Sequence, residues 1–214
     1  RGKRVTVNDA IIKSGSTKIS VDTDIVILDG QTLVLQEGFR YYMMHKPPGM
    51  VCANTDFDHP IIFDIMYDEP AINKLHTVGR LDLDTTGLLL ITDDGKWSHF
   101  ITSPKHHKPK TYRVLLAEDL IDSAEKQFEE GILLRSEKDL TQPATLKRIS
   151  NTEVLVTLNE GKYHQVKRMF AALGNHVEGL HREKIGDVSL DENLGEGEYR
   201  ELSPEEVSSL AKPS

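Results

Sequence analysis

The chain has 214 residues, enough to bury a sizeable core, and Cys52 is its only cysteine, so no disulfide forms within the chain. No apolar run reaches the ~18 residues of a membrane-spanning helix and no signal peptide is visible, so we expect a cytoplasmic protein with no membrane partner. The formal net charge of −8 at pH 7, taken alone, argues against binding to a polyanion.

Residues 1–36 alternate between strand patterns and turn residues. The strand patterns are RVTVND, TKISVDTDIVILDG and QTLVL, and turns are expected at Asn8-Asp9, Gly15 and Asp29-Gly30. This segment is too short for a core of its own and begins inside a strand pattern, so we expect it to be the C-terminal part of a small domain. Residues 37–40 are the predicted linker, and residues 41–214 form the predicted main domain.

The main domain begins with patterns of both strands and helices. The strand pattern YYMMHK ends at Pro47-Pro48-Gly49, because proline has no backbone N–H to donate. The apolar run GLLLIT predicts a buried strand that stops at a tight Asp94-Gly95 turn, and KWSHFITS predicts a short helix. The alternation in KTYRVLLAE predicts a strand with Tyr112, Val114 and Leu116 on one face.

The second half of the main domain continues the mixed pattern. ATLKRISNTEVLVTLNEG predicts two strands around a Ser150-Asn151 turn, and KYHQVKRMFAALG has the apolar spacing of a helix that stops at Gly174. Near the end, Ser203 has the properties of a helix N-cap followed by proline. Without a regular βαβ alternation, these patterns predict an α+β fold, a mixed and largely antiparallel sheet with flanking helices.

The negative charge is concentrated at the end of the chain. Residues 187–214 hold eight acidic and two basic side chains, which leaves 26 acidic and 24 basic side chains in the first 186 residues. Two segments, KHHKPKTYR (105–113) and KYHQVKR (162–168), contain no acid. They could form a local phosphate-binding surface, although each could equally be a solvated face.

Several catalytic templates are missing from the sequence. It has no GxGxxG motif, no phosphate-binding Gly-Lys-Ser/Thr loop and no GxSxG elbow. The adjacent His106 and His107 would point apart on a strand, and no cysteine pair completes a zinc site. We therefore expect no metal, and we expect Cys52 to be a small core residue.

Two aspartates directly precede the predicted buried strand in GRLDLDTTGLLLITDDG (79–95). In extended backbone, Asp82 and Asp84 would face the same side and could form a carboxylate pair like that of a glycosidase, which would release a free base. Taken in isolation, the residues favour a second interpretation, in which both aspartates are turn residues ahead of a strand.

The companions of this segment point to a known family. GRLD and TTGLLLITDDG are accompanied by HKPPG upstream, by KTY downstream and by EGKYHQVKRM further on. From about Tyr41 to Leu202 the chain resembles the pseudouridine synthases of the small-subunit ribosomal type. The segment RVTVND…DTDIVILDG resembles the second half of the S4-type RNA-binding domain that precedes the catalytic domain in that family. The resemblance implies the pseudouridine synthase fold and an isomerase that converts one uridine of 16S rRNA into pseudouridine.

The resemblance also implies the roles of individual residues. Asp82 would be the catalytic nucleophile, with Lys167 as the basic partner that keeps it ionised and in place. Tyr112 would stack on the target uracil, and Val166 would form an apolar wall beside it. Arg80 would hold a neighbouring phosphate or fill the space that the extruded base leaves.

The implied reaction breaks the C1′–N1 bond, turns the uracil and forms a carbon–carbon bond. A carboxylate can assist by attacking C1′ or by adding to the ring, and the sequence does not decide between these routes. Because no redox change occurs and no group comes from outside, no cofactor is expected.

RNA contacts are expected from basic residues around the site, namely Lys46, Lys105, Lys108, Lys110, Lys162 and Arg168. The expected partner is 16S rRNA or an assembly intermediate of the small subunit, and we expect the chain to act as a monomer. Two other functions stay open, a pseudouridine synthase that acts on 23S rRNA and a non-catalytic S4-type RNA-binding protein.

Overall fold

The computed structural model describes residues 4–20, 23–33, 38–106 and 108–212. The chain divides into two compact units, Arg1–Phe39 and Arg40–Ser214, which are described separately below. Residue 37 of the predicted linker, residue 36 before it and the last two residues of the QTLVL pattern lie outside the described residues. His107 of the predicted histidine pair also lies outside them.

The first unit is a four-stranded antiparallel sheet with the strand order β2-β1-β3-β4. Its strands are β1 (Val5–Val7), β2 (Ala10–Ile11), β3 (Val26–Leu28) and β4 (Gln31–Leu33). The predicted turns Asn8-Asp9 and Asp29-Gly30 connect strand pairs, and both residues of each turn have positive φ, as two-residue hairpin turns require.

The predicted strand TKIS is wrong, because residues 17–20 make no strand pairing. A carboxylate holds this segment in a loop instead. Asp24 accepts hydrogen bonds from the backbone N–H of Ser20 at 2.8 Å and from the side chain of Asn8 at 2.9 Å. Such a side chain competes with strand pairing by satisfying backbone donors locally.

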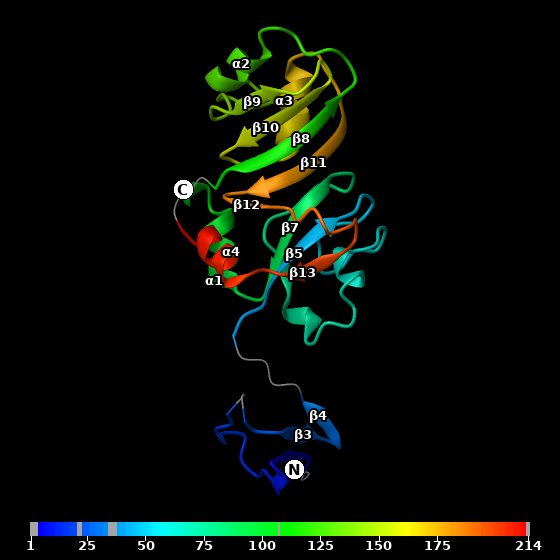
Figure 1. Ribbon diagram of the computed structural model, residues 1–214, viewed down its shortest axis with the longest axis vertical. Helices are drawn as coiled ribbons and strands as arrows, with labels where there is room; N and C mark the ends of the chain where they lie inside the picture. Colours follow the sequence, from blue (N-terminus) through cyan, green and yellow to red (C-terminus); the bar gives the residue numbers. More distant parts are fainter. Residues whose placement is uncertain (1–3, 21–22, 34–37, 107, 213–214) are drawn as a thin grey trace. The chain divides into compact units, whose positions relative to one another are not determined.

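The second unit is built on one sheet with the order β13-β5-β7-β11-β8-β10-β9 (Figure 1). The short strands β6 and β12 pair with β7 and β11, and the β7–β11 pair is parallel while the others are antiparallel. The strands are β5 (Tyr41–Lys46), β6 (His76–Thr77), β7 (Thr86–Thr92), β8 (Lys110–Leu116), β9 (Thr145–Arg148), β10 (Glu153–Leu158), β11 (Val177–Ile185), β12 (Val188–Ser189) and β13 (Tyr199–Glu201). The predicted α+β class is confirmed.

Among the described residues, four α-helices and three short 3₁₀ helices accompany the sheet. They are α1 (Gly95–Thr102), α2 (Ala124–Glu130), α3 (Gln165–Ala172), α4 (Pro204–Leu210) and the 3₁₀ helices Ile62–Asp64, Ile72–Lys74 and Pro104–His106. The predicted N-cap Ser203 is confirmed, since its side chain accepts from the N–H of Glu206 while Glu206 accepts from that of Ser203. The predicted Asp94-Gly95 turn is instead a helix start, because Asp94 accepts from the backbone N–H groups of Lys96 and Trp97.

Strand β7 lies inside the sheet between β5 and β11, and both of its faces are buried. Leu88 and Leu90 pack into one cluster with α1 and α4, whereas Leu89 and Ile91 pack into another with the loops after β5. This explains why its sequence is an unbroken apolar run instead of an alternation.

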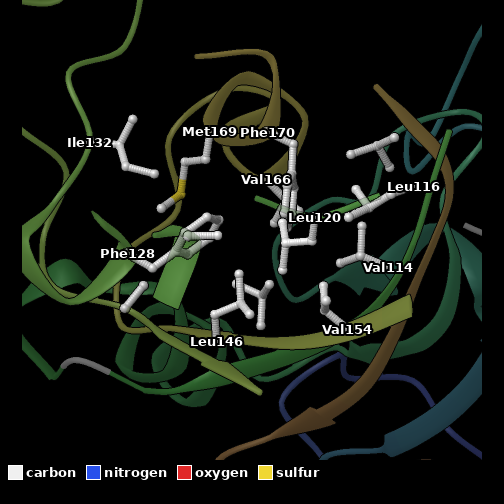
Figure 2. Packing of buried hydrophobic residues seen from close by; sticks show 14 of the residues in the cluster. Val114, Leu116, Leu120, Phe128, Ile132, Leu146, Val154, Val166, Met169 and Phe170 are labelled. Carbon is white, nitrogen blue, oxygen red and sulfur yellow. The ribbon is translucent and has the colours of Figure 1, made fainter. Parts of the chain in front are cut away.

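A third cluster fills the space between the other half of the sheet and helices α2 and α3 (Figure 2). Val114 and Leu116 of β8 face Val166 and Phe170 of α3, as the spacing in the sequence predicts. The predicted helix stop is also confirmed, because Gly174 has φ +78° and the next residue donates back to Phe170.

No helix among the described residues is long and apolar enough to cross a membrane. Helix α2 and strands β11 and β13 were not expected from the sequence. Of these, β11 matters most for the site, because it pairs with both β7 and β8 and so joins the two halves of the sheet.

Candidate active site

The GRLD segment forms a fixed loop just before β7. The N–H of Leu81 donates to the sulfur of buried Cys52 at 3.4 Å, and the N–H of Gly49 donates to the carbonyl of Leu83 at 2.8 Å. The N–H of Thr85 closes a turn on the carbonyl of Asp82 at 3.1 Å. The backbone is therefore a turn and not the extended chain that a glycosidase-like pair assumed.

The buried side chain of Lys46 holds this loop in place. Its side chain is completely buried, and Nζ donates to the carbonyls of Pro47 at 2.9 Å, Leu83 at 3.3 Å and Thr85 at 2.9 Å. Burial lowers the pKa of Lys46, and the negative charges of Asp82 and Asp84 partly oppose this effect. The prediction that Lys46 contacts RNA is corrected, because its ammonium group is inside the protein and positions the Asp82 loop.

Asp82 is held by two groups from the segment that begins α3. Nζ of Lys167 lies 3.4 Å from Oδ2 of Asp82, and Nε2 of His164 lies 3.3 Å from Oδ1. About a quarter of the Asp82 side chain, 27%, is exposed. The carboxylate therefore has cationic or hydrogen-bonding partners on both oxygens and still faces solvent.

Lys167 also binds Asp84, and more closely than it binds Asp82. Nζ of Lys167 donates to Oδ1 of Asp84 at 2.6 Å, and this bond lowers the pKa of Asp84. Burial lowers the pKa of Lys167, but the two carboxylates outweigh burial and leave it raised. Lys167 thus bridges two aspartates, whereas the sequence analysis assigned it only to Asp82.

The residue types expected around a substrate line one cavity of about 230 Å³. Asp82 and Arg80 reach it from the loop, Tyr112 from β8 and Val166 from the first turn of α3. Val166 is buried, Tyr112 is half-buried and Arg80 is exposed. The fold thus brings together side chains that are separated by up to 86 residues in the sequence, as Arg80 and Val166 are.

The remaining basic candidates have different environments. Lys105 is exposed and lies outside the cavity lining, whereas Lys108 and Lys110 belong to the cavity lining. Lys162 and Arg168 both bind Glu137, at 3.2 Å and 3.1 Å, so part of their charge is neutralised within the protein. Lys108 is only 4% exposed, so the alternative of a solvated face for residues 105–113 does not hold at this position.

Sequence reasoning missed two residues of the site, His164 and Arg182. His164 precedes α3 in left-handed conformation, with φ +47°, and its ring stacks on the exposed Tyr163 at 3.7 Å. Its place beside Gln165 and Lys167 in KYHQVKR was a signal that could have found it. Arg182 lies in β11, whose alternation is broken by charged residues, so no pattern in the sequence pointed to it.

Arg182 is packed against β7 at a position where only glycine fits. Gly87 has φ +104°, and a Cβ there would lie 2.3 Å from the carbonyl oxygen of Arg182. The close approach lets Nε of Arg182 donate to the carbonyl of Leu88 at 2.8 Å. Among the described residues, no group of three or more His, Cys, Asp or Glu side chains could hold a metal ion.

A nucleophile candidate in a cavity with an aromatic ring and several cations is the arrangement expected of an enzyme that works on an extruded nucleotide. The family model for RNA pseudouridylate synthase matches residues 40–172. The chain therefore belongs to the RNA pseudouridylate synthase family, and the predicted isomerase class is confirmed.

Similar proteins agree with this assignment. The chain is 52% identical over 210 residues to ribosomal small subunit pseudouridine synthase A of Escherichia coli (strain K12), covering 98% of this chain and 90% of that protein. It is 53% identical over 212 residues to the protein of the same name from Haemophilus influenzae, covering 99% and 90%. A crystal structure of a pseudouridylate synthase matches with a TM-score of 0.78 and 52% identity, covering 97% of this chain and 89% of that chain.

Proposed function

We propose that the protein isomerises a uridine of small-subunit ribosomal RNA to pseudouridine, with Asp82 as the nucleophile. The observation that carries the proposal is the position of Asp82, a part-exposed carboxylate in the cavity with Lys167 at 3.4 Å and His164 at 3.3 Å. The names of the two bacterial relatives support the small subunit as the target over 23S rRNA.

In this proposal each side chain has a separate task. Asp82 attacks either C1′ of the ribose or the uracil ring, and the C1′–N1 bond breaks. Tyr112 and Val166 confine the uracil while it turns and C5 bonds to C1′. The bond that Asp82 had formed breaks and restores the free carboxylate, the proton on C5 leaves and N1 gains one. Lys167 keeps the carboxylate oriented toward the cavity, because its positive charge lies 3.4 Å from Oδ2 of Asp82.

We infer that two exposed side chains, Arg80 in the cavity lining and Lys105 outside it, contact the RNA backbone. We also infer that the first unit, Arg1–Phe39, contributes RNA binding as an S4-type part. The protein is proposed to act as a monomer in the cytoplasm, where ribosomal subunits are assembled. The proposal of a monomer is supported by the observation that described residues of a single chain supply Asp82, Lys167 and the lining of the cavity.

The test is to incubate unmodified 16S rRNA with the protein and to map pseudouridine chemically. We expect one modified uridine in 16S rRNA and no release of free uracil. Free uracil would indicate a glycosidase, and modification of 23S rRNA alone would overturn the target while leaving the chemistry. RNA binding without any modification would indicate a non-catalytic RNA-binding protein.

A further inference from the structure

Besides Arg80 and Lys162, the cavity lining carries three further cationic side chains, called the wall cations below. Lys108 lies two residues before β8, Lys110 is the first residue of β8, and Arg182 comes from the neighbouring strand β11. Lys108 and Arg182 are 4% and 3% exposed, so these charges are almost entirely removed from bulk water. Asp82 belongs to the lining of the same cavity.

The three cations are held mainly by carbonyl groups. Nε of Arg182 donates to Leu88 O at 2.8 Å, Nζ of Lys110 to Lys108 O at 3.1 Å and Nζ of Lys108 to Ser209 O at 3.4 Å. The terminal nitrogen Nη2 of Arg182 is buried and has no hydrogen-bond partner among the described residues. A buried guanidinium nitrogen without a partner is costly, which indicates that something else satisfies it.

The carboxylates that line the cavity are already engaged elsewhere. Asp82 contacts Lys167 and His164, and Glu160 accepts from the backbone N–H of Gln142 at 2.8 Å and from Gln165 at 2.6 Å. Within the described part of the chain, none of the three wall cations forms an ion pair with a carboxylate, although Asp187 acts on Lys108 through space.

The cations also disfavour one another. Burial and then the charge of Arg182 lower the pKa of Lys110 to about 8, and burial lowers the pKa of Lys108. Positive groups that are desolvated together without a counter-ion destabilise the empty protein, and a bound anion would reverse that effect. A phosphate group has the charge and the acceptor oxygens that an arginine fork and two ammonium groups can bind.

We propose that Arg182, Lys110 and Lys108 bind a phosphate group of the nucleotide whose uracil enters the cavity. The inference rests on the proposed function, which it extends by assigning the anion site next to the nucleophile. Once the C1′–N1 bond is broken, the uracil and the ribose are no longer joined, and the RNA backbone has to keep the ribose in position. A phosphate fixed to the cavity wall keeps C1′ still while the uracil turns to present C5, so these residues position the substrate.

The test is a set of binding titrations of the full chain, monitored by NMR. The ligands are uridine, uridine 5′-monophosphate, uridine 3′-monophosphate and inorganic phosphate. We expect at least one monophosphate to bind roughly tenfold or more tightly than uridine, as a charge-assisted contact predicts. Arg182→Gln and Lys110→Gln should each abolish that difference. Lys184→Gln is the matched control on β11, since it removes a charge outside the cavity lining and should preserve it.

Asp82→Asn separates this inference from the proposed function, because it should keep the preference for the monophosphate whether or not Asp82 is the nucleophile. Folding of each variant is checked by circular dichroism. If Arg182→Gln does not fold, the result for Lys110→Gln alone tests the proposal. Monophosphates that bind no better than uridine, or an unchanged preference in Lys110→Gln, would overturn the proposal. Inorganic phosphate that binds more tightly than either nucleotide would also overturn it, because the site would then serve a free anion.

Discussion

Nζ of Lys167 lies 3.4 Å from Oδ2 of Asp82, across 85 residues of sequence. The same ammonium group donates to Asp84 at 2.6 Å, so it ties both aspartates of the loop to helix α3. The exposed Asp84 anchors the lysine, and the more protected Asp82 remains available to a substrate in the cavity. The two nearby carboxylates of the loop therefore have different roles.

Replacing Lys167 with methionine should lower the rate of pseudouridine formation by roughly 100-fold or more, because the nucleophile loses its nearest cation. Unfolding free energy should change by less than about 1 kcal/mol, since the ion pairs are partly exposed. Single-turnover assays and thermal melts measure both effects. Lys126→Met removes an exposed lysine from an ion pair with Glu130 and should leave the rate unchanged. Equal rates in the two variants would contradict the role of Lys167.

Replacing Lys46 with methionine should destabilise the protein by about 2–4 kcal/mol, because three carbonyls, of which that of Thr85 is buried, lose their common donor. Activity should fall as well, since the loop that carries Asp82 loses its support. Urea denaturation with the exposed Lys96→Met as control measures the change. A Lys46→Met protein as stable as this control would show that the ammonium group does not hold the loop.

Replacing Gly87 with alanine should cost at least about 3 kcal/mol or prevent folding, because the left-handed backbone is strained and the new Cβ meets backbone atoms of Arg182. Gly161 is the matched control, since it has open space for a Cβ and no positive φ. Comparison of the melting temperatures of the two alanine variants is sufficient. A small effect at Gly87 would mean that β7 and β11 can move apart.

Lys110 should make stability depend on pH above neutrality. Its pKa is about 8 in the folded protein, against an ordinary value of 10.5, because burial and Arg182 disfavour its charge. Between these values the unfolded chain binds more protons, so the free energy of unfolding should rise with pH, by up to about 2 kcal/mol. Denaturation at pH 7 to 10 should show this rise in the wild type and lose it in Lys110→Met. Parallel curves would place the Lys110 pKa near its ordinary value.

Much of the fold could be predicted from local pattern. The apolar run of β7, the alternation of β8 and the caps Ser203 and Gly174 are features of neighbouring residues, and the structure contains each of them. Strand β11 could not be predicted this way, since its pairing with two other strands tolerates a buried arginine. The Asp94-Gly95 turn was wrong because Asp followed by Gly suits a turn and a helix start equally well.

Prediction of the site from the sequence has the same limit. The motifs located Asp82, Tyr112 and Lys167, and the roles given to them remain predictions. The burial of Lys46 and Lys108 could not be deduced, because a lysine in a loop looks alike in sequence whether it faces solvent or backbone carbonyls. Arg182 escaped notice because its importance comes from contacts with distant strands.

The most direct test of the account compares Asp82→Asn with Asp84→Asn in pseudouridine formation on unmodified 16S rRNA. Asparagine keeps the size of aspartate but removes the anionic oxygen, so Asp82→Asn should have no detectable activity, a loss well beyond ~100-fold, while binding RNA about as well as the wild type. Asp84→Asn should remain within about tenfold of the wild type, because it loses one contact to Lys167 and leaves the nucleophile intact. Near-wild-type turnover by Asp82→Asn, or an inactive Asp84→Asn beside an active Asp82→Asn, would contradict the assignment of Asp82 as the nucleophile.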